Sequence, residues 1–168
     1  MKPNALFMEQ VKIVPAYTYN TQGGARTSDR VSMENYNNAL ILVQSYQAAN
    51  SAVAITVDAF TAATSGSTSA GITFNTWWEL EDCVVGALTS DTWTRSSAAA
   101  ASVTTTTSAT GTSYYAIELN ADDLTISGVN YPWFAVQVAS GSASNILSII
   151  VFLYNPRYSQ NALPTAIA

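Results

Sequence analysis

The chain has 168 residues, enough for one domain with a sizeable core; 48% of them are apolar and only 10% are charged. A net charge of −5 and six scattered basic residues argue against nucleic-acid binding, which needs a clustered basic patch. Without histidine, Ser-His-Asp and Cys-His catalytic schemes and histidine-bearing zinc sites are excluded, and the lone Cys83 excludes an internal disulfide.

The start of the chain does not resemble a targeting segment. Lys2, Glu9 and Lys12 interrupt its apolar residues, so the uninterrupted apolar core of a signal peptide is missing. The longest apolar run, Ile149–Tyr154, is far shorter than the roughly 20 residues that span a bilayer. We therefore expect a protein that is made in a cytoplasm and does not enter a membrane.

Turn-forming residues divide the chain into three parts. Pro3, Pro15 and the loop-like stretch NTQGGARTSDR predict an N-terminal arm over residues 1–30. Strand patterns fill residues 31–158, which we expect to be one β-sandwich domain. Residues 159–168 follow as a C-terminal tail.

Alternating apolar residues predict strands in the central part. The stretches SAVAITVDAF, YYAIEL and YPWFAVQVAS each place every second apolar side chain on one face, and NNALILVQSY is a nearly continuous apolar strand. The expected inward positions are Val53, Ile55, Val57, Tyr115, Ile117, Leu119, Phe134, Val136 and Val138. No amphipathic helix is evident. The fold class is therefore all-β, a single antiparallel β-sandwich with jelly-roll-like topology and extensions at both ends.

The last strand, in the stretch NILSIIVFLY, is apolar on both faces. Leu147, Ile149 and Val151 fall on one face, and Ile150 and Phe152 on the other. A strand with one wet face would alternate apolar and polar residues. Either this strand is central and fully buried, or its second face is covered by the N-terminal arm, a loop or another subunit.

Three acidic residues form the best candidate for catalytic chemistry. Glu79, Glu81 and Asp82 lie in WWELED, beside tryptophan, as paired carboxylates do in glycosidases. Catalytic carboxylates usually come from different strands, however, and a solvated strand face explains this cluster better. We expect no catalytic residue, and the chain is not predicted to be an enzyme.

Two hypotheses of ligand binding remain, and each has a structural alternative. Trp77, Trp93 and Trp133 could stack against sugars, although core or interface packing is the usual role of such aromatics. Asp122 and Asp123 could bind calcium, but acids at the start of a helical turn capped by Asn120 explain them better. We expect no cofactor and no bound metal.

Residues 31–160 resemble small structural proteins from the head-gene clusters of tailed bacteriophages. The resemblance rests on the ending YPWFAVQVASGSASNILSIIVFLYNPRYSQNA, where an aromatic strand and a Ser/Gly/Ala turn precede a final apolar strand and an LY-x-PRY-like motif. The stretch YYAIELNADDL and the order of VSMENYNNALILV and WWELED are similar too. The N-terminal arm has no counterpart in this resemblance.

The resemblance implies a capsid decoration, or cement, protein with a jelly-roll-like fold on the outside of a phage head. Its expected partners are the major capsid protein and further copies of itself, with a homotrimer as the leading arrangement. It would be made in the host cytoplasm and then join the virion. The resemblance implies an anchor after the last strand at Pro156, Arg157 and Tyr158, and the apolar Leu163 and Ile167 of the tail are further interface candidates.

The rival function is a carbohydrate- or receptor-binding β-sandwich module, such as a fibre tip or a lectin. A cement protein is present in many copies per particle and a fibre tip in few. Binding to glycans in solution would favour the rival.

Overall fold

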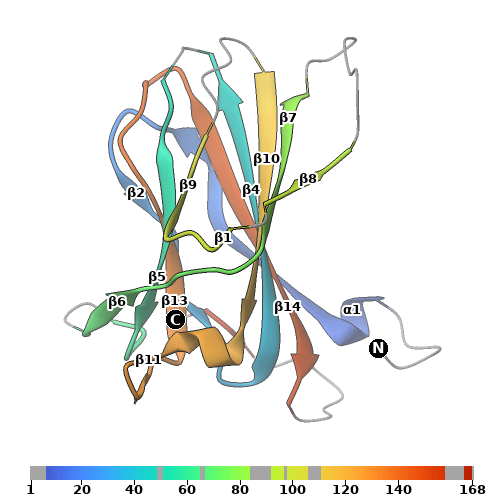
Figure 1. Ribbon diagram of the computed structural model, residues 1–168, viewed down its shortest axis with the longest axis vertical. Helices are drawn as coiled ribbons and strands as arrows, with labels where there is room; N and C mark the ends of the chain where they lie inside the picture. Colours follow the sequence, from blue (N-terminus) through green and yellow to red (C-terminus); the bar gives the residue numbers. More distant parts are fainter. Residues whose placement is uncertain are drawn as a thin grey trace.

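Two β-sheets are the main elements of the computed structural model, which describes residues 7–48, 51–64, 67–83, 92–96, 98–105, 111–157 and 165–167 (Figure 1). The elements in chain order are α1 (Phe7–Gln10), β1 (Val11–Thr21), β2 (Arg26–Thr27), β3 (Val31–Ser32), β4 (Tyr36–Gln47), β5 (Ala54–Phe60), β6 (Ser69–Gly71), β7 (Trp77–Cys83), β8 (Thr94–Arg95), β9 (Ser102–Thr104), β10 (Gly111–Asn120), η1 (Ala121–Leu124), β11 (Thr125–Ile126), β12 (Val129–Asn130), β13 (Trp133–Val138) and β14 (Ile146–Pro156). Among these described residues, no helix is long and apolar enough to cross a membrane.

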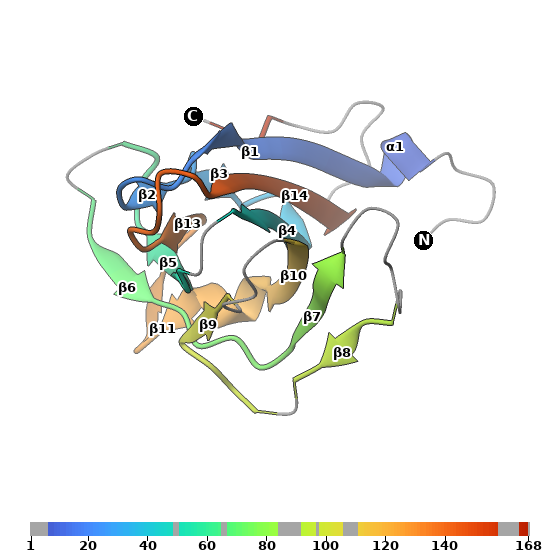
Figure 2. The same ribbon diagram turned by 90° about the horizontal axis from the view of Figure 1, so that it is seen from above.

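The first sheet has the strand order β1-β14-β4-β10-β7-β8, and the second has the order β2-β13-β5-β6, with β3 beside β13 and β9 beside β5. Every pairing between these strands is antiparallel. Seen from above, the first sheet curves from β1 past β14, β4 and β10 to β7, with β13 and β5 opposite (Figure 2). The expected all-β antiparallel sandwich is confirmed, and its arrangement is consistent with a jelly roll.

The core lies between the two inner sheet faces. All nine inward positions expected from alternation are buried, from Val53, directly before β5, to Val138 at the end of β13. On the first sheet, alternate residues of β4 and β14 such as Ile41 and Val151 are fully buried against them. The period-2 pattern therefore identifies the core because side chains on a strand point alternately to opposite faces.

The expected N-terminal arm is wrong for residues 11–21. They form β1, which pairs with β14 at the edge of the first sheet, and Val11, Val14 and Ala16 are buried. Two register shifts interrupt this pairing, between Val14 and Tyr17 and between Tyr17 and Asn20. These irregularities, together with Pro15, break the alternation from which a strand can be recognised.

The end of the tail lies on its own domain. Ile167 forms an antiparallel bridge with Val31, and Ser32 N donates a hydrogen bond to Ala166 O at 2.8 Å. Ala166 is 1% exposed and packs in the core. Residues 165–167 of the expected C-terminal tail therefore contact their own domain.

Candidate interaction surface

The outer face of the first sheet, which points away from the second sheet, carries an apolar band two rows wide. One row contains Phe152 of β14 opposite Leu40 of β4, and the next contains Ile150 opposite Leu42. The same registers extend the rows into β1, β10 and β7. The apolar band consists of Ile13, Leu40, Leu42, Trp78, Ala116, Ile150 and Phe152.

The band exists because two neighbouring central strands are apolar on both faces. β14 lies between β1 and β4, so it is a central strand. A central position was one of the two alternatives predicted from its sequence. Its inward residues such as Ile149 and Val151 are buried, but the outward Ile150 and Phe152 are only half-buried. Within the described residues, the outer face is therefore not sealed, and it offers apolar surface to a partner.

A hydrogen-bonded polar row borders the apolar band on one side. Asn155 Nδ2 donates to Asn38 Oδ1 at 2.7 Å, and Asn38 Nδ2 donates to Asn120 Oδ1 at 2.6 Å. This asparagine row therefore crosses β14, β4 and β10 with its amides linked in series.

A second polar row borders the band on the other side. Ser148 Oγ donates to Gln44 Oε1 at 3.3 Å, and Gln44 Nε2 donates to the Tyr114 hydroxyl at 3.2 Å. Along the strands the outer face thus has the order polar, apolar, apolar, polar. An apolar centre with a polar rim is the usual anatomy of a protein–protein interface.

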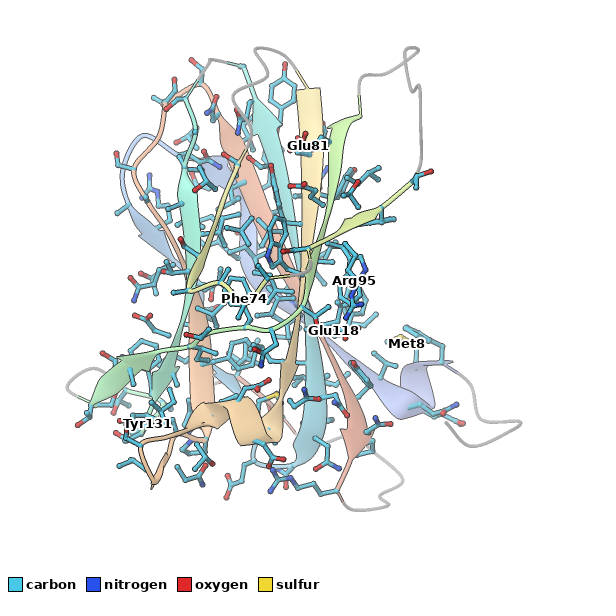
Figure 3. The ribbon with its side chains drawn as sticks, in the orientation of Figure 1. Met8, Phe74, Glu81, Arg95, Glu118 and Tyr131 are labelled. Carbon is cyan, nitrogen blue, oxygen red and sulfur yellow. The ribbon has the colours of Figure 1, made fainter. Side chains whose placement is uncertain are left out.

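Two opposite charges lie at the β10–β7–β8 end of the band. The guanidinium of Arg95 is 6.0 Å from the centre of the Trp78 ring and Arg95 Nη2 donates to Thr76 Oγ1 at 3.5 Å, while Glu118 N donates to Thr76 O at 3.4 Å. Both side chains are exposed, and both are labelled on this side of the molecule in Figure 3. Burial, and then the Glu118 charge, raise the pKa of Tyr154 on the same face, which keeps that phenol neutral.

The short helix α1 adds apolar surface at one corner. It packs against β1 and β14, and the side chains of Phe7 and Met8 are 54% and 61% exposed. Figure 3 places Met8 on the same side of the molecule as Arg95 and Glu118. The outer face of the first sheet therefore continues into α1.

The acidic residues of WWELED have different surroundings. Glu79 pairs with the buried Tyr115 and points toward the inner side of the sheet, where it is half-buried, whereas Glu81 is exposed near the far end of β7. The side chains of Asp82 and Cys83 lie outside the described residues. Among the described side chains, no group of three acidic or cysteine residues could hold a metal ion.

The three tryptophans singled out as a sugar platform lie on separate surfaces. Trp77 packs against the core, Trp133 lies on the outer face of the second sheet opposite Phe60, and Trp93 is 39% exposed just before β8. They therefore do not form one binding surface. Trp78, which the sequence did not single out, is the tryptophan that joins the apolar band.

Asp122 and Asp123 lie in the single turn η1, which confirms the helical turn predicted after Asn120. Asn120 N donates to Asp123 Oδ2 at 2.7 Å, which fixes the start of this turn. This contact confirms a structural role for Asp123.

The post-strand residues have different environments. Pro156 is the last residue of β14. Arg157 N donates to Asn35 O at 2.9 Å, while the Arg157 side chain is exposed. Ile167 contacts Val31 of its own chain. Tyr158 and Leu163 lie outside the described residues. An interface role for the residues of this group remains a prediction.

Sequence reasoning recognised the doubly apolar β14 but not the surface to which it belongs. The missing information was strand order, because only the pairing of β14 with β4 brings Phe152 beside Leu40. A signal was present in NNALILVQSY, whose Leu40 and Leu42 alternate with the inward Ile41.

No protein-family model matches the chain, and no curated protein matches it. Among solved structures, SPBc2 prophage-derived protein YomS is similar with a TM-score of 0.48 and 6% identity, over 86% of this chain and 93% of that chain. Desmodium yellow mottle tymovirus gives a TM-score of 0.30 and 10% identity, over 96% and 97% of the two chains. The CBM22-1–GH10 modules of Clostridium thermocellum xylanase 10B, complexed with xylohexaose, give a TM-score of 0.29 and 8% identity, over 93% of this chain and 28% of that chain. Similarities with TM-scores below 0.5 assign neither a family nor a function.

Proposed function

We propose that this chain is a structural virion protein, a capsid decoration or cement protein that binds the outside of a phage head and stabilises contacts between capsomers. Its partners are the major capsid protein and further copies of itself. It acts through surface contacts and carries out no reaction. The homotrimer implied by the sequence resemblance remains a prediction.

The single observation that carries this proposal is the apolar band on the outer face of the first sheet. Its two rows combine aromatic and branched apolar side chains with a rim of neutral amides and hydroxyls. A continuous apolar band with a polar rim supports binding of a partner, because covering apolar surface removes it from water. The resemblance of residues 31–160 to phage head proteins supports a phage capsid as the partner that this surface binds.

The copy number of the chain in purified particles tests the proposal. We expect a quantified gel of heads from the phage that encodes the chain to show a fixed ratio of the chain to the major capsid protein, with about one copy for each repeated capsomer contact. A few copies per particle, together with binding to glycans in solution, would instead support the fibre-tip or lectin function.

A further inference from the structure

We propose that the apolar band is the site where a second copy of the chain packs, in a two-fold contact that places Arg95 of one copy beside Glu118 of the other. The inference rests on the proposed function in that it specifies the self-association included there. It makes a dimer, rather than the expected trimer, the unit formed in solution.

The order of the rows on the outer face is symmetric. The asparagine row at Asn38, the apolar rows at Leu40 and Leu42, and the polar row at Gln44 follow one another along β4. A two-fold axis in the plane of the contact, running across the strands between the two apolar rows, lays each apolar row on the other. The same rotation lays the asparagine row on the row of Gln44. An isologous interface requires this self-complementarity.

The two charges fit the same axis. Glu118 pairs with Leu40 and so continues the first apolar row, whereas Ala116 and Trp78 continue the second. The rotation therefore places Glu118 of one copy over Ala116 of the other, next to the Arg95 guanidinium that lies over Trp78. The rotation repeats the pair at the same end of the contact, in the neighbouring row. A second copy thus supplies both complementary charges at the required positions, which an unrelated partner would have to match independently.

The available area suits a weak but specific dimer. Strands about 4.8 Å apart and residues about 3.3 Å apart give the four rows from β1 to β7 a surface of about 500 Å² per copy. The total of about 1,000 Å² lies near the lower limit for specific interfaces. Trp78 and Arg95 are of the residue types that dominate interface energies. Two sheets can pack face to face at about 10 Å, which the half-buried side chains of the band allow.

Charge reversal with complementary mixing tests this contact. The oligomeric state of wild-type protein, Arg95→Glu and Glu118→Arg is measured by sedimentation velocity over a concentration series, without capsids. Arg26→Glu on β2 and Glu34→Arg in the loop before β4, which make the same charge changes elsewhere in the chain, are the matched controls. Circular dichroism and urea unfolding establish that each variant is folded.

We expect the wild type and both controls to dimerise at high concentration. Arg95→Glu and Glu118→Arg should each raise the dimer dissociation constant at least about tenfold, since like charges then meet in both symmetry-related pairs. An equal mixture of Arg95→Glu and Glu118→Arg should restore dimers, because every Glu then faces an Arg. A wild type that stays monomeric up to about 1 mM, a stable trimer, or a mixture that remains as weak as its components would overturn the proposal. Capsid binding is measured separately, so these outcomes do not depend on the decoration function.

Discussion

Gly141 lies where a side chain has no room. A Cβ atom at this position would be 2.6 Å from Val53 Cγ1 and 3.1 Å from Gln22 Oε1. The same glycine donates its N–H to Gln22 O at 2.9 Å, so the backbone is held in place and cannot move aside freely. A glycine at position 141 therefore fixes how closely the turn before β14 approaches β5.

Replacing Gly141 with alanine should destabilise the fold by about 1–3 kcal/mol, the usual cost of forcing a methyl group into a packed site. The matched control is Gly24→Ala, because a Cβ at position 24 meets nothing within 4 Å. Urea unfolding of the two variants measures the difference. Equal stabilities for the two variants would show that the fold has room for a Cβ atom at position 141.

Asp58 on the outer face of the second sheet is a carboxyl group in an unfavourable environment. Burial raises its pKa above the usual value, and the hydrogen bond that Gln137 Nε2 donates to it offsets part of the rise. The folded protein therefore retains the Asp58 proton to higher pH than the unfolded chain does. Stability falls as the pH rises from the ordinary aspartate pKa through the folded-state pKa.

We expect Asp58→Asn to be more stable than the wild type at neutral pH and about equally stable near pH 3, where both states of the wild type are protonated. The asparagine Oδ1 can still accept the hydrogen bond from Gln137. Thermal unfolding over a pH series provides the measurement. A variant that is less stable at neutral pH would mean that the ionised Asp58 contributes favourable contacts.

β14 joins the two surfaces of the first sheet through neighbouring residues. Ile149 is 1% exposed and packs in the core, whereas Ile150 is half-buried in the apolar band. Ile149→Ala should cost about 2–5 kcal/mol, since it removes transfer free energy and leaves a cavity. Ile150→Ala should cost about 1 kcal/mol when measured at concentrations where the chain is monomeric. Similar losses at the two positions in urea unfolding would argue that the outer face is covered within one chain.

The end of the chain should contribute to folding. A truncation that removes residues 165–168 eliminates the hydrogen bond from Ser32 N to Ala166 O and exposes part of the core beside Val31. We expect it to lower the free energy of unfolding by about 1–3 kcal/mol, because apolar surface of Val31 and Ala166 that is now buried would be lost or exposed to water. A truncated protein with the stability of the full chain would show that residues 165–167 contribute nothing to folding.

The long strands of both sheets could be predicted from alternation, since a buried inner face imposes a period of two on residues such as Val57, Ile117 and Val136. β1 could not, because Pro15 and two register shifts disturb the pattern. Two-residue strands such as β2 and β8 are too short to carry any pattern. The apolar band depends on which strands are neighbours, and contacts distant in sequence determine that order.

The two outer faces of the whole molecule differ in chemistry. The outer face of the second sheet carries the Asp58–Gln137 hydrogen bond, and Arg30 lies 4.0 Å from the Phe60 ring and donates to Ala62 O and Ser67 Oγ at 2.8 Å. Asp58, Gln137 and Arg30 are therefore engaged within the chain. The first sheet instead presents the apolar band, which is the surface suited to assembly.

Binding of the purified chain to phage heads that lack it tests the central claim most directly. Cosedimentation should show saturable binding in a fixed ratio to the major capsid protein, and decorated heads should withstand heating that disrupts bare heads, because bound copies stabilise the folded and assembled state by mass action. Heads that bind no chain, or that bind it and rupture at the same temperature as bare heads, would contradict the proposed role as a capsid cement protein.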